Sequence, residues 1–425
     1  MLLQISPPPI DYQSSTTNRE IVVSLPVSIS QAASGAASDG TADALLAAAR
    51  AMRADLSARA EEGEATCRLS PETVDAFRRA GLFRILQPRS FGGLEDTPLT
   101  LLRVQATVSE IDMSAGWVLA NMGAVAFHLA LFDGRAQDDV WGTDPDTILS
   151  SSNMPGGRLH AEADGTLSLS GQWRFSSGVD HADWVMLGAL LTGDGEPLAG
   201  ACVVPRRDIE IVEDWDVAGL RGTGSHAVRV AEARVPAYRF LAHAHRFHGT
   251  APGLRVHAGP LYRQPLPQIL FRTISTSSLG GLRGMLAGFL EANRERTSMM
   301  AQRIAEDPHV QDLCARIEAD LAAQWQILEA DQEDLARAAR HGRDVPLARR
   351  RVFRLNATRV ADLCFSHAAD LLRAAGAAAL YRGSPLLRAF NDMLAARQHA
   401  ANQYELHARN DGAALFGRAQ EDMLL

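Results

Sequence analysis

The sequence contains no lysine, so its 42 Lys and Arg positions are all arginine. This absence excludes chemistry that depends on a lysine amine, such as a Schiff base with a carbonyl substrate. Acidic residues outnumber basic ones and give a formal net charge of -8. Such a chain has no excess of positive charge to attract nucleic acid or an anionic membrane surface, and we expect neither as a partner.

Cysteine is also scarce, and the four that are present lie far apart without a CxxC pair. They are Cys67, Cys202, Cys314 and Cys364. This spacing argues against a disulfide framework or a zinc site and fits a reducing compartment, so we expect a cytoplasmic protein without a metal. The first residues lack a basic segment followed by an apolar core, so no secretory signal is expected.

Long uncharged runs are rare, and the one at 114–132 has the length of a membrane span. It contains serine, glycine, asparagine and histidine, which favours a buried core helix instead. Hydrophobic residues make up 46% of the chain, enough for the cores of two or three domains or layers.

One stretch organises the rest of the sequence: LSLSGQWRFSSGVDHADWVMLG at 167–188. It is typical of two β-strands joined by a turn of small residues. Its aromatic side chains are Trp173, Phe175 and Trp184. These rings offer stacking surface, and the hydroxyls of Ser176 and Ser177 could reach the edge of a flat heteroaromatic ligand. The alternative interpretation is a plain hairpin with a Ser/Gly turn.

The order of predicted elements divides the chain into four parts. Residues 1–40 are rich in Pro, Ser, Gly and Ala and predict a disordered extension. Residues 41–145 predict helices, including one that Ser70 caps, and residues 146–242 predict short strands with glycine turns. Residues 243–425 predict a bundle of antiparallel helices over Gln268–Arg303, Pro308–His341, Pro346–Ala375 and Pro385–Arg409.

Four stretches in this order resemble a known fold: SAGWVLANMGAVAFHLALF (114–132), GQWRFSSGVDHADW (171–184), EDWDVAGLRGTGSHAVRVAEARVP (213–236) and PLLRAFNDMLAARQHAANQ (385–403). The chain resembles the acyl-CoA dehydrogenase fold. It looks most like the oxygenase components of two-component flavin monooxygenases such as hydroxyphenylacetate and secosteroid phenol hydroxylases and dibenzothiophene monooxygenase. The resemblance implies an α+β fold: an N-terminal α domain, a middle antiparallel β-barrel domain and a C-terminal four-helix bundle.

The resemblance also implies a flavin site. Ser176 or Ser177 would lie against the N5/O4 edge of the flavin, and Trp215 would line the isoalloxazine pocket. Further cofactor contacts would be Ser225, Asn153 and Arg296, the last being a helical arginine that meets the flavin phosphate, often in a neighbouring subunit. A β-turn for Ser225 and Asn153 and a solvated helix face for Arg296 are the alternatives.

The last stretch separates two chemistries. Acyl-CoA dehydrogenases need a glutamate base, and counting along the last helix puts that position at about Ala400; the other family position, near 271–274, also lacks Glu. His399 stands beside it and is our candidate catalytic residue, as base, hydrogen-bond partner or proton donor. Asp392 precedes it by two turns and is expected to pair with an arginine. The resemblance makes Trp117 and His128 substrate contacts, a core histidine being the alternative for His128.

The function implied is hydroxylation of an aromatic, phenolic or polycyclic molecule with O2 and reduced FMN, FAD being the alternative, through a flavin C4a-hydroperoxide. No βαβ unit for NAD(P)H is present, so a separate flavin reductase is expected as a partner. The resemblance also implies a homotetramer. The alternatives are a flavoenzyme that oxidises a CoA thioester, oxygenation of a nitrogen or sulfur atom, and a scaffold without activity.

Overall fold

The computed structural model describes residues 39–193, 195–246, 249–297 and 301–418. The extension predicted for residues 1–40 therefore lies almost wholly outside the described residues. The chain begins with helices α1 (Asp39–Ala51), α2 (Arg53–Thr66), α3 (Pro71–Arg79), α4 (Pro98–Ser109), α5 (Met113–Ala130) and α6 (Gly134–Trp141). The side chain of Ser70 accepts a hydrogen bond from the N–H of Thr73, and Pro71 opens α3, so the predicted cap is confirmed.

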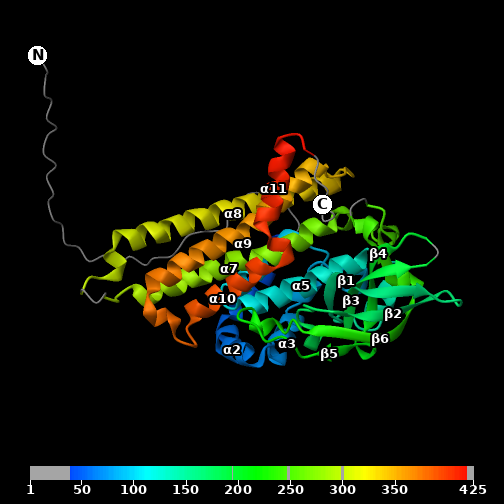
Figure 1. The fold of residues 1–425 in the computed structure, drawn as a ribbon, viewed down its shortest axis with the longest axis horizontal. Coiled ribbons are helices and arrows are strands. Elements are labelled where there is room, and N and C mark those ends of the chain that lie inside the picture. Colours follow the sequence, from blue (N-terminus) through cyan, green and yellow to red (C-terminus); the bar gives the residue numbers. More distant parts are fainter. Residues whose placement is uncertain (1–38, 194, 247–248, 298–300, 419–425) are drawn as a thin grey trace, which may run out of the picture. The chain divides into compact units, whose positions relative to one another are not determined.

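Helix α5 is the central element of this part (Figure 1). Asp112 caps its first turn by accepting hydrogen bonds from the N–H groups of Ser114 and Ala115. In the described chain α5 is the helix that is long and apolar enough to cross a membrane, but 94% of it is buried inside the protein. It packs against α4, the sheet and the C-terminal bundle, which makes it the core helix that the sequence predicts.

The middle of the chain forms one sheet in the order β5-β6-β2-β1-β3-β4-β7. Its strands are β1 (Leu149–Ala161), β2 (Thr166–Trp173), β3 (Trp184–Thr192), β4 (Leu198–Pro205), β5 (Glu210–Val212), β6 (Ala227–Pro236) and β7 (Phe240–Ala242). The fold class is confirmed, but two details differ from the prediction. β1 pairs with β3 in parallel, so the sheet is mixed rather than antiparallel, and β5 and β7 are edges rather than partners in a closed barrel.

The stretch 167–188 is therefore not a hairpin. Its two strands, β2 and β3, lie on opposite sides of β1 and do not pair with each other. The segment between them has to cross β1, and it does so through the short 3₁₀ turn Val179–His181. This crossing carries Ser176 and Ser177 out of the sheet toward α5.

The C-terminal helices are α7 (Leu266–Asn293), α8 (Pro308–Arg340), α9 (Leu347–Ala375), α10 (Pro385–Gln398) and α11 (Tyr404–Leu415). α8 and α9 match their predicted bounds within about a residue. α7 ends ten residues before the predicted Arg303, and the predicted last helix is broken into α10 and α11. The break is a 3₁₀ turn, Ala400–Asn402, that Asn402 anchors by donating from Nδ2 to the carbonyls of Ala396 and Ile274.

Three layers meet at the start of α5. Trp117 of α5 and Leu220 of the loop between β5 and β6 both belong to the hydrophobic core that α7, α9 and α10 share. Figure 1 shows α5 between the long helices and the sheet. The predicted site residues of three different segments are therefore close enough to interact at this junction.

Candidate functional site

A chain of hydrogen bonds runs from α5 into the loop between β5 and β6. The indole Nε1 of Trp117 donates to Oγ of Ser177 at 3.1 Å, and this hydroxyl lies 2.8 Å from Oγ of Ser225. Ser225 lies 2.7 Å from Oγ1 of Thr223, which donates to the carbonyl of Leu220 at 2.8 Å. The predicted residues Trp117, Ser177 and Ser225 thus converge, and Thr223 joins them.

Leu220 connects this chain to the bundle. Its carbonyl also accepts from Nε1 of Trp215 at 3.0 Å, and its N–H donates to Oδ1 of Asp392 at 2.6 Å. The adjoining Gly219 packs so closely on α10 that an added Cβ would lie 2.0 Å from the carbonyl oxygen of Asn391. The expectation that Asp392 pairs with an arginine is wrong, because its hydrogen-bond partner is this loop backbone.

An aromatic wall stands beside the chain. The rings of Trp215 and Phe175 meet edge to face with centroids 6.0 Å apart. Phe175 is 60% exposed and has a φ of +67°, a conformation that costs a non-glycine residue energy and marks functional sites. The backbone N–H of Trp215 donates to Nδ1 of His226 at 3.3 Å, which fixes the main chain that carries the indole. In contrast, Trp173 is buried in the sheet core with its Nε1 on the carbonyl of Gly188, so it offers no stacking surface.

The two adjacent serines differ in their surroundings. Ser177 is half-buried, and the hydroxyl of Ser150 holds its carbonyl at 2.9 Å. Ser176 is fully buried, its N–H donates to the carbonyl of His226, and its own hydroxyl has no partner among the described residues. Of the two serines, Ser177 is the one that belongs to the hydrogen-bond chain and the more exposed one.

The sequence predicts His399 within the helix Pro385–Arg409, but in the structure His399 directly follows α10 as its C-cap residue. Its Nδ1 accepts a hydrogen bond from the N–H of Ala401 at 3.0 Å. Its ring meets Trp117 edge to face at 5.7 Å. Burial, and then the charge of Arg354, lower the pKa of the imidazole to about 4, so it is neutral at pH 7. A neutral imidazole with an accepting Nδ1 carries its proton on Nε2.

Arg354 of α9 fixes the turn that follows His399. Its guanidinium is buried, donates from Nη1 to the carbonyl of Ala401 at 2.6 Å and stacks on the ring of Phe271 at 3.6 Å. One residue, Ala401, thus accepts from Arg354 through its carbonyl and donates to His399 through its amide. Ala400, the position of the missing glutamate, is exposed in this turn.

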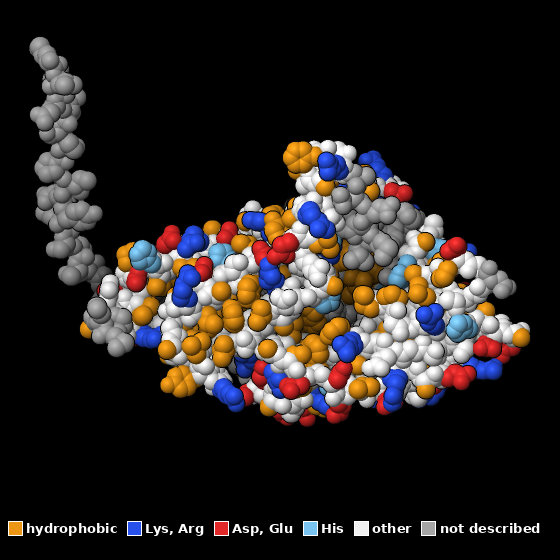
Figure 2. All heavy atoms as spheres, viewed as in Figure 1, with side chains coloured by type: hydrophobic (Ala, Val, Ile, Leu, Met, Phe, Trp, Pro, Cys, Tyr) orange, Lys and Arg blue, Asp and Glu red, His pale blue; other side chains and the backbone are white. Residues whose placement is uncertain are grey.

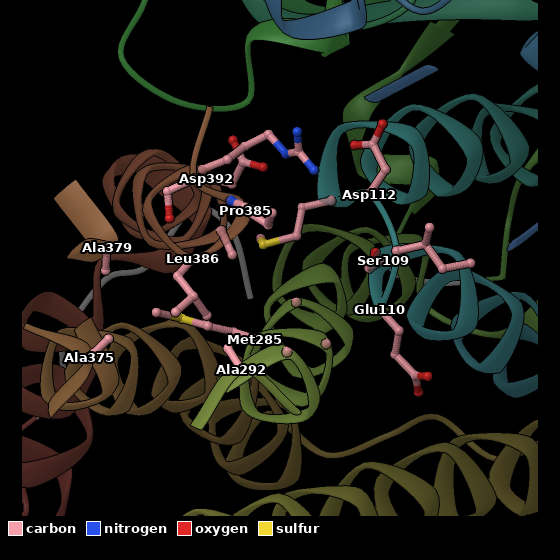
Figure 3. Close-up of a pocket in the computed structure, with 18 of the residues that line it drawn as sticks. Ser109, Glu110, Asp112, Met285, Ala292, Ala375, Ala379, Pro385, Leu386 and Asp392 are labelled. Atoms are coloured by element: carbon pink, nitrogen blue, oxygen red, sulfur yellow. The ribbon is translucent and has the colours of Figure 1, made fainter. Parts of the chain in front are cut away.

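A separate cavity of about 330 Å³ lies between the ends of α7 and α10 and residues 109–113 (Figure 3). Asp112 and Asp392 line it, and burial raises the pKa of both carboxyl groups. Arg296 also lines it, but the prediction of a helical arginine is wrong, because α7 ends at Asn293. The Arg296 guanidinium donates to Oδ1 of Asn293 and to the carbonyl of Ala375. Asp392 is the link between this cavity and the hydrogen-bond chain.

Two predicted residues lie elsewhere. His128 is buried in the core near the far end of α5, with its ring against Phe132. Eleven residues of helix separate it from Trp117, or about 16 Å along the axis. Asn153 is half-buried at an irregularity of β1 between Ser152 and Gly157. The structure brings neither residue to the hydrogen-bond chain.

The sequence analysis did not find that Thr223 belongs to the hydrogen-bond chain or that Arg354 holds the turn after His399. Thr223 stands two residues before Ser225 in a segment that does carry a resemblance, so the signal was present there. Arg354 lies in a helix that reads as an ordinary amphipathic element with several arginines, and nothing in its spacing marks it.

Comparisons with known proteins identify the family to which this fold belongs. Residues 272–404 match the family model "Acyl-CoA dehydrogenase, C-terminal domain". The chain is 35% identical over 367 residues to the flavin-dependent monooxygenase oxygenase subunit HsaA of Mycobacterium tuberculosis, covering 86% of this chain and 93% of that protein. The crystal structure of that HsaA superposes with a TM-score of 0.85 at 34% identity, over 90% of this chain and 100% of the other.

Two further relatives name their flavin. The FADH2-dependent resorcinol hydroxylase oxygenase component of a Rhizobium species is 29% identical, over 84% of this chain and 90% of that protein. XiaF of a Streptomyces species, solved with FADH2 and glycerol, has a TM-score of 0.83 at 25% identity, over 89% of this chain and 96% of the other. The chain therefore belongs to the family of flavin-dependent monooxygenase oxygenase subunits built on the acyl-CoA dehydrogenase fold.

Proposed function

We propose that this oxygenase hydroxylates a phenolic or related aromatic small molecule with O2, using reduced flavin that a separate NAD(P)H-dependent reductase supplies. The observation that carries the proposal is the convergence of Ser177, Trp215 and His399 around Trp117 and Leu220 at one junction. The oxygenase subunit names of the relatives support the separate reductase.

The residues at this junction suit a flat heteroaromatic cofactor. Trp215 and Phe175 offer ring faces and edges for stacking, and the Ser177 hydroxyl offers one polar contact at the ring edge. Reduced flavin held here would supply the two electrons that activate O2, so that one oxygen atom of O2 can pass to the substrate and the other to water. The buried side chains of Trp117, Thr223 and Ser225 keep water from the inner side of the site.

His399 orients the substrate in this proposal. Its Nε2–H has no partner among the described residues and can donate to a phenolic oxygen. A phenol has a pKa of about 10, so an imidazole with a pKa of about 4 is a poor base for it. The donated hydrogen bond instead stabilises the phenolate and so favours attack from the ring carbon beside it. The Trp117 ring forms a flat wall for the substrate.

We propose that both FADH2 and FMNH2 are accepted, with FADH2 bound more tightly, because two relatives of 25–29% identity name FADH2, whereas FMN is named for a structural neighbour of 20% identity. Arg296 is proposed to meet the flavin phosphate in a homotetramer, from a neighbouring subunit. Figure 2 shows hydrophobic side chains gathered on one face of the molecule. The exposed apolar residues of the bundle include Leu290, Leu347, Leu380 and Tyr381, and they support such an assembly. The four free cysteines fit the proposed cytoplasmic location.

The test supplies the full chain with a flavin reductase, NADH, either flavin, 18O2 and a panel of phenols. We expect one labelled oxygen atom in each molecule of product, and His399→Ala should still consume O2 but release it mainly as hydrogen peroxide. The rival function, thioester oxidation, predicts that acyl-CoA is oxidised without the reductase and that no phenol is labelled. That result would overturn the proposal.

A further inference from the structure

The hydrogen-bond chain between Trp117 and Leu220 has only one direction. At one end the Trp117 indole can only donate, and at the other the Leu220 carbonyl can only accept. Between them stand three hydroxyls, those of Ser177, Ser225 and Thr223. Four hydrogen atoms thus serve four hydrogen bonds, and all four form only if each hydroxyl donates toward Leu220.

This direction decides what Ser177 can offer a ligand. Its single hydrogen is used on Ser225, and one of its two lone pairs accepts from Trp117. One lone pair remains, so Ser177 faces the site as an acceptor and not as a donor. The direction originates at Thr223, because its hydroxyl is the one that bonds to an atom unable to donate.

Water has little access to the inner hydroxyls, so it does not reverse the direction of the hydrogen-bond chain. Thr223 is 1% exposed and Ser225 4%, so both hydroxyls are shielded from water. The Leu220 carbonyl already accepts from Trp215 as well as from Thr223, and its N–H is held by Asp392. The acceptor at the end of the chain is therefore fixed at the carbonyl itself, and the residue that carries it is also held through its amide.

We propose that Thr223 is a positioning residue that makes this site select reduced over oxidised flavin. The inference rests on the proposed function, with Ser177 as the serine that meets the flavin N5 edge, a contact that the resemblance implies for Ser176 or Ser177. Reduced flavin carries a hydrogen on N5 and can donate to the free lone pair of Ser177. Oxidised flavin presents a lone pair at N5, and two acceptors facing each other leave both unsatisfied, which weakens binding.

The test compares dissociation constants of the full chain for oxidised FAD and, anaerobically, for FADH2, by quenching of tryptophan fluorescence. We expect the wild type to prefer FADH2 by at least about tenfold, the equivalent of one unsatisfied hydrogen bond. Thr223→Val removes the donor while Trp215 still satisfies Leu220, so Ser225 and Ser177 can turn around and the preference should fall about tenfold. The bound flavin's two-electron potential should then drop by about 30 mV. Thr223→Ser keeps the hydroxyl and should keep the wild-type ratio.

Each outcome decides the inference. If Thr223→Val binds both flavins with the wild-type ratio, the inference is wrong and the proposed function stands. If the wild type binds neither flavin, the proposed function itself fails. If Thr223→Val does not fold, Ser225→Ala decides, because it frees the Ser177 hydrogen by another route and should lower the ratio in the same way; an unchanged ratio there also overturns the inference.

Discussion

The contact between Gly219 and α10 yields the sharpest prediction. An alanine Cβ at this position would lie 2.0 Å from the carbonyl oxygen of Asn391, whereas ordinary contact begins at 3.4 Å. The loop would have to move by about 1.4 Å, which would stretch the 2.6 Å bond from Leu220 to Asp392 beyond hydrogen-bond length. Overpacking and two buried polar groups without partners together cost about 2–5 kcal/mol.

Gly219→Ala should therefore lower Tm by about 2–6 °C in a chain of 425 residues and, because Leu220 orients Trp215 and the hydroxyl chain, weaken FADH2 binding at least about tenfold. Calorimetry and anaerobic flavin titration measure the two effects. Gly193→Ala is the matched control, since an added Cβ there meets nothing within 4 Å. If Gly219→Ala matches this control in both measurements, the loop does not depend on the contact with α10, and the reasoning is refuted.

Three other substitutions test single interactions. Trp117→Phe keeps a ring against His399 but removes the donor to Ser177, so the free energy of unfolding in urea should fall by about 1 kcal/mol. An unchanged free energy would show that the hydrogen bond between Trp117 and Ser177 does not stabilise the fold. Folding lowers the pKa of His399 from 6.5 to about 4. As pH falls from 6.5 to 4, the free energy of unfolding of the wild type should therefore fall by about 2–3 kcal/mol relative to that of His399→Gln, and by less where solvent screens the half-buried ring. The prediction fails if urea unfolding gives the same pH dependence for both proteins. Burial raises the pKa of Asp392, so the folded state favours the protonated carboxyl and the protein loses stability as pH rises above 3.8. Asp392→Asn keeps an acceptor for the N–H of Leu220 but does not ionise, so its Tm should rise relative to that of the wild type from pH 5 to 8.

Local signals in the sequence were enough for most helices. Ser70 followed by Pro71 predicted the start of α3, because the cap hydroxyl and the proline act within one turn. The predicted bundle helices that begin at Pro308 and Pro385 also begin there in the structure, as α8 and α10. The resemblance added Ser177, Ser225 and Trp215, which the structure brings to one place.

Pairing between segments that are distant in the chain could not be predicted from the sequence. The stretch 167–188 reads as a hairpin because its strands are adjacent in the chain, but β1 pairs with both and separates them. The partner of Asp392 is a loop amide 172 residues away, and no periodicity on α10 points to it. The break at His399 was missed because the residues around it form helices well, and the turn is held by side-chain hydrogen bonds of Arg354, Asn402 and His399 itself.

The state of His399 argues against proton abstraction in either candidate chemistry. A pKa of about 4 leaves the ring unprotonated at pH 7, but its conjugate acid is then about 2.5 units stronger than that of an ordinary histidine. A base of this kind would take a proton from carbon or from a phenol at a cost about 3 kcal/mol higher than usual. With Ala400 in the place of a glutamate, thioester oxidation has no base at this turn, whereas a phenol can release its proton to solvent while its oxygen accepts the hydrogen bond that Nε2–H can donate.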